Sequence, residues 1–162
     1  MKLTTILGSI FVSMLAFAST AHANRIAGNG TDFQALTNAQ QACLQRNTDG
    51  WMWYNYSSGT CGSMTVVSPT IVMNGGTGSL GCYVDGSCPS GQTVTCNLKE
   101  IAWGNGSQVS GSSVSTQTST AGSTFDLSLS MDRTYIGDYN YSTIWCTMGA
   151  GCRIWGYSCS TP

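Results

Sequence analysis

Hydrophobic and polar residues alternate without interruption over Phe125–Met131, where Phe, Leu, Leu and Met are separated by Asp, Ser and Ser. Successive side chains of a β-strand point to opposite faces of a sheet, so this period of two predicts a strand with one buried and one solvated face. Half-buried strands of this kind are typical of antiparallel sheets.

Clusters of β-branched and aromatic residues bounded by turn residues predict further strands. They occupy Trp51–Tyr56, Met64–Val67, Thr70–Met73, Thr93–Leu98 and Thr134–Ile136. Tight turns are predicted where glycine, which readily adopts a positive φ, follows Asn or Asp, at Asn74-Gly75, Asp85-Gly86 and Asn105-Gly106. The Ser- and Thr-rich segment Ser107–Ser123 is interpreted as extended structure within the same domain.

A helical pattern replaces the strand pattern near the start of the chain. One helical face is shared by Phe33, Leu36, Gln40 and Cys43. Thr31 and Gln34 have the spacing of a capping box, in which the two side chains satisfy free amides at a helix start. We therefore expect a helix over Asp32–Arg46 that packs on the sheet.

These patterns predict a mainly β fold, an antiparallel sandwich or barrel-like domain with one N-terminal α-helix. The chain of 162 residues has the length of one domain, and its 41% hydrophobic content is enough to build a core. We expect this single disulfide-rich domain to span residues 24–162.

Residues 1–23 have the pattern of a secretory signal peptide. Lys2 precedes an apolar stretch over Leu3–Ala18, and Ala21-His22-Ala23 matches the A-x-A cleavage pattern. The apolar stretch is shorter than the roughly 20 residues that span a bilayer, so we expect cleavage and no membrane span. The mature chain, from Asn24, is expected to be secreted and extracellular, with the periplasm as the alternative location.

The mature chain contains eight cysteines, which are Cys43, Cys61, Cys82, Cys88, Cys96, Cys146, Cys152 and Cys159. An even number in an exported chain predicts disulfides, so we expect four bridges. Neither a metal site nor a cofactor is predicted, since the mature chain has no C-x-x-C pair and no histidine to complete a zinc site. One local pairing is expected, Cys43 with Cys61, which would connect the helix to the next strand.

Two sequence patterns occur twice in the chain. Cys82-x5-Cys88-x7-Cys96 is similar to Cys146-x5-Cys152-x6-Cys159. The segments Tyr54–Cys61 and Tyr139–Cys146 share YNYS-(S/T)-x-x-C. A duplicated β unit with two similar aromatic surfaces would explain both patterns, and chance similarity in a Ser- and Tyr-rich chain is the competing interpretation.

Charge and histidine content exclude several functions. Charged residues make up 8% of the chain, and without Lys2 five basic residues face seven acidic ones, so nucleic-acid binding lacks its electrostatic basis. His22 is the sole histidine and leaves with the leader, which excludes Ser-His-Asp, Cys-His and HExxH sites in the mature chain. Lys99 and Glu100 are expected to form a solvated charge pair at a strand end.

Aromatic residues exceed what one small core needs, which points to a binding surface. The candidate ligand-binding residues are Trp51, Trp53, Tyr54, Tyr56, Tyr139, Tyr141 and Trp145. Aromatic faces stack on sugar rings, and neighbouring Asn, Asp and Ser side chains supply directional hydrogen bonds. We therefore expect a non-catalytic, lectin- or adhesin-like module that binds a glycan or cell-surface ligand. Core and cross-strand packing is the competing interpretation for any single one of these residues.

Two other function classes stay open. A secreted disulfide-rich inhibitor or toxin-like effector would present a rigid loop, for example Tyr83–Pro89, to a protein partner. A two-carboxylate glycosidase needs no histidine. Asp132 and Asp138 flank an aromatic segment and are the best pair for it, with ordinary turn placement as the competing interpretation.

Overall fold

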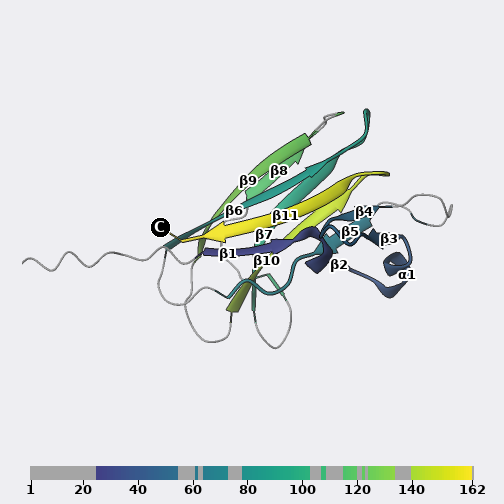
Figure 1. Cartoon of the computed structure of the whole chain (residues 1–162). Helices are drawn as coiled ribbons and strands as arrows, with labels where there is room; N and C mark the ends of the chain where they lie inside the picture. The colour runs from purple at the N-terminus through teal and green to yellow at the C-terminus, as the bar shows by residue number, and fades with distance from the viewer. Residues whose placement is uncertain are drawn as a thin grey trace, which may run out of the picture.

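The computed structural model describes residues 25–54, 61, 64–72, 78–102, 107–108, 115–119, 122, 124–133 and 140–161. Within these residues the chain forms two antiparallel β-sheets and two short helical turns (Figure 1). The predicted mainly β, antiparallel fold is confirmed. No helix of the described residues is long and apolar enough to cross a bilayer.

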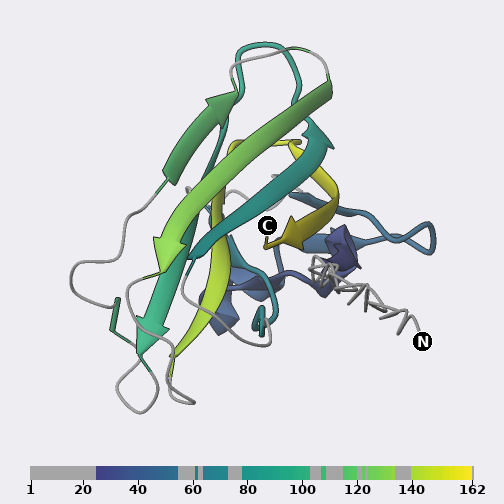
Figure 2. The same ribbon diagram turned by 90° about the vertical axis from the view of Figure 1, so that its left-hand side faces the viewer.

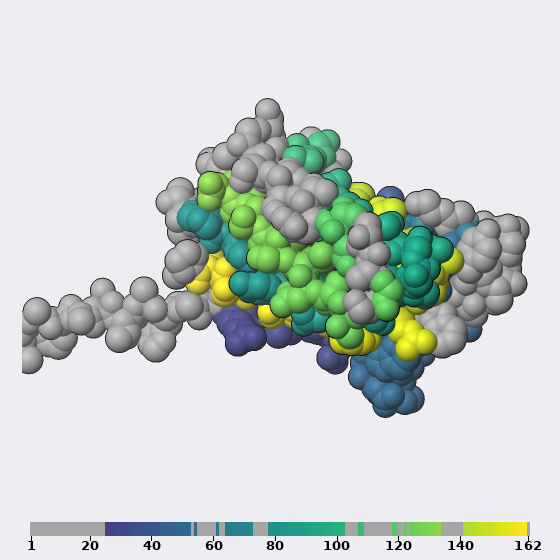
Figure 3. All heavy atoms as spheres, turned by 90° about the horizontal axis from the view of Figure 1, so that it is seen from above, coloured from purple at the N-terminus to yellow at the C-terminus, as the bar shows by residue number. Residues whose placement is uncertain are grey.

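The first sheet has six strands in the order β3-β4-β11-β6-β9, and β1 pairs with β11. The strands are β1 (Arg25–Asn29), β3 (Leu44–Arg46), β4 (Met52–Tyr54), β6 (Gly78–Ser87), β9 (Thr124–Arg133) and β11 (Arg153–Ser160). Figure 1 shows β9, β6, β11 and β1 side by side. The hairpin of β3 and β4 (blue) stands out from the body of the molecule in the space-filling view (Figure 3).

The second sheet has five strands in the order β2-β5-β10-β7-β8. The strands are β2 (Gln34–Ala35), β5 (Met64–Val67), β7 (Val94–Ala102), β8 (Ser115–Ser119) and β10 (Asn140–Met148). β8 lies within the segment that was expected to be extended. Every strand pairing in both sheets is antiparallel.

The core is formed by the inward-facing residues of both sheets. In the first sheet β6 and β9 run side by side (Figure 2). Buried and exposed residues alternate along both strands, and Leu80 lies opposite Met131. In the second sheet Val94 lies opposite Met148, and both are buried. The alternation predicted over Phe125–Met131 is confirmed, since it coincides with the central part of β9.

Two strand–turn–strand units cross from one sheet to the other, and we call them arches. Arch 1 (residues 78–102) runs from β6 through Cys88 into β7, and arch 2 (residues 140–160) runs back from β10 through Cys152 into β11. They pair along both sheets. Their three disulfides are Cys82–Cys159, Cys88–Cys152 and Cys96–Cys146. The fourth disulfide is the expected pair, Cys43–Cys61.

The repeated cysteine spacing matches the pairing of the two arches. The first cysteine of arch 1 bonds to the last of arch 2, and the last of arch 1 to the first of arch 2. Five residues separate the first two cysteines of arch 1, whereas six separate their partners Cys152 and Cys159. A β-bulge between Ile154 and Gly156 takes up the extra residue. Similar spacing is therefore a requirement of the antiparallel pairing.

The helix expected over Asp32–Arg46 is wrong. The segment contains the end of a 3-10 turn, η1 (Gly30–Asp32), then β2, the four-residue helix α1 (Asn38–Gln41) and β3. Strand pairing overrides the local pattern here, since β2 pairs with β5 and β3 pairs with β4. Arg46 donates hydrogen bonds to the carbonyl oxygens of Thr31 and Phe33, at 3.1 and 3.0 Å, which a helix would have used for its own amides.

The cap of α1 explains part of this error. The Thr-x-x-Gln spacing occurs at Thr31–Gln34 and again at Thr37–Gln40. The second occurrence caps the helix, because the Thr37 hydroxyl accepts a hydrogen bond from the Gln40 amide at 3.4 Å. Leu36, which the helical pattern assigned to the packed face, is 49% exposed.

The predicted turn at Asp85-Gly86 is also wrong, because both residues lie inside β6. A Cβ at Gly86 would overlap the Arg153 carbonyl and the Phe125 ring, so this glycine permits a close approach of neighbouring strands. β5 has its predicted bounds, and β4 and β7 overlap predicted strands. Ile71 forms an isolated bridge with Ser142. The predicted strand Thr134–Ile136 and the turns Asn74-Gly75 and Asn105-Gly106 lie outside the described residues.

Removal of the Cys82–Cys159 bridge by a double substitution to Ala is expected to destabilise the fold by about as much as removal of Cys43–Cys61. With Cys88–Cys152 intact, the first bridge closes a loop of only 13 residues, 6 from Cys82 to Cys88 and 7 from Cys152 to Cys159, and the second closes 18. Loop-closure entropy gives about 3 kcal/mol for either loop. Guanidinium unfolding of both variants measures the two losses. A loss that is several kcal/mol larger for Cys82–Cys159 would show that the nested bridge does not shorten its loop.

Candidate ligand-binding face

The outer face of the six-stranded sheet gathers aromatic and acidic side chains. Because Leu80, Cys82 and Val84 point into the core, the alternate residues Tyr83 and Asp85 of β6 point outward. Tyr83 is 48% exposed. The same alternation along β9 places Asp126 and Ser128 outward. We call this surface the outer face; its central residues are Trp51, Tyr83, Asp85, Asp126 and Trp155.

The bulge in β11 brings Trp155 onto the outer face. Ile154 pairs with Gly86 and Gly156 pairs with Asp85, so Trp155 is the extra residue of the bulge. Ile154 and Tyr157 are both buried, which leaves Trp155 pointing away from the core with 42% of its surface exposed. Trp155 therefore lies across from Asp85 on the neighbouring strand.

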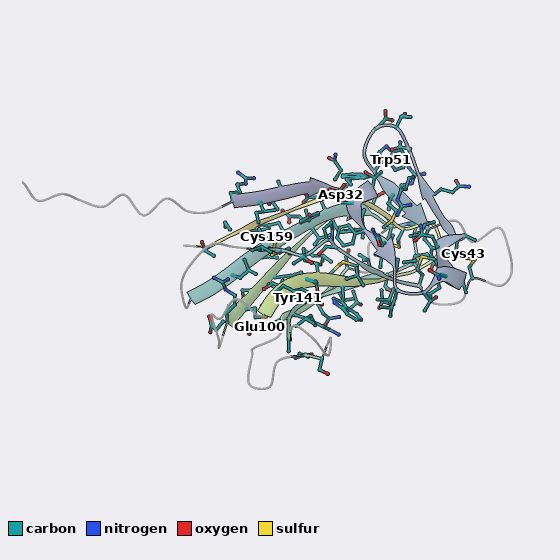
Figure 4. The ribbon with its side chains drawn as sticks, turned by 90° about the horizontal axis from the view of Figure 1, so that it is seen from below. Asp32, Cys43, Trp51, Glu100, Tyr141 and Cys159 are labelled. Atoms are coloured by element: carbon teal, nitrogen blue, oxygen red, sulfur yellow. A yellow bond between two sulfur atoms is a disulfide. The ribbon has the colours of Figure 1, made fainter. Side chains whose placement is uncertain are left out.

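Trp51 lies on the hairpin next to this bulge. Met52 pairs with Ile154, and extending that antiparallel register by one residue brings Trp51 beside Trp155. The guanidinium of Arg153 lies over the Trp51 ring, 4.7 Å from its centroid, in a cation–π contact. The ring also lines a shallow depression of about 200 Å³ together with Gln45, Arg46 and Asn47. Figure 4 shows Trp51 in the protruding hairpin.

The turn that carries Trp51 is held by the side chain of Asn47. Its carbonyl oxygen accepts hydrogen bonds from the amides of Asp49 and Trp51, each at 3.1 Å. Gly50 in this turn has a φ of 88°, a conformation that glycine adopts at little cost. Together with the two hydrogen bonds of Arg46, these contacts hold the depression on a well-anchored hairpin.

Asp85 and Asp126 lie directly opposite each other in the β6–β9 ladder. Opposed residues of an antiparallel pair have Cβ atoms about 5 Å apart, so two carboxylates share one patch of the outer face. Desolvation and, second, the negative charge of Asp126 raise the pKa of Asp85 above 3.8. The patch therefore favours ligands that donate hydrogen bonds or carry positive charge.

Asp32 places a third carboxylate in the 3-10 turn that follows β1. Its carboxylate accepts a hydrogen bond from the amide of Asn29 at 2.9 Å. Burial, and second the charge of Asp32, raise the pKa of the Tyr157 hydroxyl. The ring of Tyr157 packs edge-on against Phe33, with 5.5 Å between centroids, and so belongs to the core.

The residues predicted in the first aromatic segment have different environments. Trp51 belongs to the outer face. Tyr54 is 2% exposed and its hydroxyl donates a hydrogen bond to the Cys61 carbonyl, so it is a core residue. The backbone of Trp53 pairs with Gln45 and Arg153, while its side chain lies outside the described part of the structure. Tyr56 lies outside the described residues as well.

The second aromatic segment belongs to the five-stranded sheet. Tyr141 and Trp145 of β10 are half-buried and alternate with the buried residues Ser142 and Ile144, while Tyr139 lies outside the described residues. The Lys99 ammonium is 4.3 Å from the centroid of the Trp145 ring. The indole N–H of Trp145 donates a hydrogen bond to the Thr143 hydroxyl at 2.7 Å.

The two predicted segments therefore do not form one surface. Trp51 is next to the six-stranded sheet, whereas Tyr141 belongs to the five-stranded sheet (Figure 4). Trp145 is on the same side of β10 as Tyr141. Lys99 and Glu100 are neighbours in β7, so their side chains face opposite sides of the five-stranded sheet. Glu100 is buried across from Ser142, so the expected solvated charge pair is wrong.

Sequence reasoning missed the most exposed aromatic residues of the outer face, Tyr83 and Trp155, as well as the acidic pair. A usable signal exists in Leu80, Cys82 and Val84, which alternate with Tyr83 and Asp85. The strand was not predicted because Asp85-Gly86 matches a turn dipeptide. Trp155 has no such signal, because a bulge breaks the period of two.

The structure describes only part of the residues predicted for the glycosidase and for the inhibitor or effector. Asp132 is exposed on β9 opposite Ser79, and Asp138 lies outside the described residues. Most of the loop suggested at Tyr83–Pro89 is strand, because β6 continues to Ser87. Among the described residues, no three His, Cys, Asp or Glu side chains are grouped so that they could hold a metal ion.

No protein-family model, no curated protein and no solved structure matches this chain.

Asp126→Asn is expected to lower the pKa of Asp85 and to stabilise the fold at neutral pH. A carboxyl group whose pKa is raised by folding stabilises the fold fully below its ordinary value of 3.8, and this contribution is lost as the pH rises through the higher folded value. Removing the opposing charge reduces that loss. Carboxyl NMR titration measures the pKa, and thermal unfolding at neutral and acidic pH measures the stability.

Asp132→Asn is the matched control for this experiment, because it removes an exposed carboxylate of the same strand that faces Ser79. We expect it to leave the pKa of Asp85 nearly unchanged. An unchanged Asp85 pKa in Asp126→Asn would show that the two carboxylates do not interact.

Proposed function

We propose that this protein is a secreted, non-catalytic recognition module that binds a glycan through the outer face of its six-stranded sheet. One observation carries the proposal. Tyr83 and Trp155 hold large aromatic surfaces in solvent beside Asp85, whose partner Asp126 lies in the next strand. Large aromatic side chains are usually covered in a small domain, so their exposure on one face indicates a binding surface.

The chemistry of the outer face suits a sugar ligand. Flat aromatic rings stack on the C–H faces of sugar rings, in the same way as they pack on other apolar groups. The carboxylates of Asp85 and Asp126 accept hydrogen bonds from hydroxyl groups, and bonds to charged acceptors are the stronger ones. The side-chain amides of Gln45 and Asn47 line the depression beside Trp51 and add polar groups at its end.

The disulfides and the leader pattern support a role outside the cytoplasm. Four disulfides fit an oxidising compartment. The leader pattern over residues 1–23 supports secretion, with the periplasm as the alternative. An adhesin-like role, in which the ligand belongs to a cell surface, is consistent with both observations.

A two-carboxylate glycosidase is the second candidate, and one observation favours it. Asp85 and Asp126 are opposed residues, whose Cβ atoms are about 5 Å apart, so their carboxyl groups can reach the separation of roughly 5 Å that retaining enzymes use. The pKa of Asp85 is raised, as a general acid requires. This pair replaces Asp132 and Asp138 as the one to test. Release of reducing ends from a bound glycan, abolished in Asp126→Asn, would favour the enzyme over the binding module.

Trp155→Ala and Tyr83→Ala are expected to reduce glycan binding about fivefold to tenfold each, since each removes a stacking surface worth about 1 to 1.4 kcal/mol. Binding of the oxidised, exported chain to a glycan array identifies the ligand, and titration calorimetry measures the loss. Both side chains are on the surface, so the circular dichroism spectrum should stay unchanged.

Tyr141→Ala and Trp145→Ala on the five-stranded sheet form the comparison arm. We expect both to bind as the unmodified chain does. Loss of binding in this arm, with normal binding by Tyr83→Ala and Trp155→Ala, would move the site to the other sheet. Absence of any glycan ligand, with capture of a protein partner that sugars do not displace, would favour the inhibitor or effector class.

A further inference from the structure

The aromatic residues of the outer face are spread over three neighbouring chain segments. Trp51 directly precedes β4, Trp155 is in β11 and Tyr83 is in β6. Strands are about 4.8 Å apart and rise about 3.4 Å per residue, which puts Trp51 about 5 Å from Trp155 and Trp155 about 8 Å from Tyr83, measured between Cα atoms. The line of three residues is on the order of 13 Å long, more than one sugar ring can cover.

Small residues surround Tyr83 and flank the bulge. Tyr83 lies between Ser158 of β11 and Ser128 of β9, and Gly156 follows Trp155. Side chains of this size cannot cover the tyrosine ring, which is 48% exposed. No large neighbouring side chain at these positions therefore blocks a ligand that contacts both Tyr83 and Trp155.

The two carboxylates select against acidic sugars at the Tyr83 end of the outer face, whereas Arg46 and Arg153 lie at the Trp51 end. Asp85 of β6 lies across from Trp155, Asp126 of β9 lies opposite Asp85, and each like charge brought to them costs free energy. Neutral hydroxyl groups instead donate hydrogen bonds to the carboxylates. Arg153, the basic residue nearest to Trp155 in sequence, has its guanidinium placed over the Trp51 ring.

We propose that the ligand is an unbranched, uncharged, β-linked glycan chain of several sugars that lies across the strands from Trp51 over Trp155 to Tyr83. The inference rests on the proposed function and specifies its ligand class. β-1,4-Linked hexose chains are extended ribbons with apolar C–H faces, and a row of exposed aromatic residues on neighbouring strands is complementary to such a ribbon. The depression beside Trp51 receives one end of the bound segment.

The test compares β-1,4-linked oligomers of glucose and of N-acetylglucosamine that contain one to six sugars. Affinity for the oxidised, exported chain is measured by titration calorimetry. We expect it to rise with chain length, by roughly tenfold for each sugar that gains an aromatic partner, and then to level off. A β-1,4-linked glucuronate oligomer of the same length serves as the acidic comparison, because it changes the charge and keeps the linkage, and it should bind more weakly.

Two variants separate the ends of the site. Tyr83→Ala should lower the affinity for long oligomers to that for short ones and leave the short ones unchanged. Trp155→Ala should lower the affinity for all lengths, because Trp155 is the central residue. Leu36→Ala is the control, since Leu36 is as exposed as Tyr83 and lies outside the outer face.

The outcomes distinguish this inference from the proposed function. Equal binding of a single sugar and a six-sugar oligomer, with loss in Trp155→Ala, would overturn the chain ligand and leave glycan recognition intact. Tighter binding of the β-1,4-linked glucuronate oligomer would also overturn it. Absence of binding to every glycan on the array and in both oligomer series would overturn the proposed function itself.

Discussion

The antiparallel pairing of the two arches is the constraint on which the rest of the structure depends. β6 pairs with β11 in one sheet and β7 pairs with β10 in the other, and a disulfide joins the arches in each sheet and at the turn. Because both crossings between the sheets are bonded to each other, the inward faces of four central strands are fixed together. The remaining strands add to this frame by ordinary ladder hydrogen bonds.

This frame explains why Tyr83 of β6 and Trp155 of β11 lie outside. The inward positions of these strands are already filled by cystines and by side chains such as Leu80, Val84 and Ile154, which are fully buried. Charged residues make up only 8% of the chain, so few long charged side chains are present to cover an exposed ring. Tyr83 and Trp155 are therefore exposed beside serine and glycine.

The parts of the fold that depend on neighbouring residues in the sequence were predictable. The alternation over Phe125–Met131 and the bounds of β5 follow from side-chain period, and the number of disulfides follows from the even cysteine count. The helix over Asp32–Arg46 was not predictable in this way, because β2 and β3 are strands only through partners distant in the chain. In the candidate site, Trp51 was predicted from the excess of aromatic residues. The Asp85–Asp126 pair was not predictable, because it depends on the register between β6 and β9.

Trp155 has fewer folding constraints than most strand residues. A substitution of an inward residue changes the packing of the core, and a regular outward residue has a partner opposite it in the ladder. Trp155, the extra residue between Ile154 and Gly156, has neither constraint. A substitution at this position can change the chemistry of the outer face at little cost to folding, so the surface can diverge here while the cysteine frame is kept.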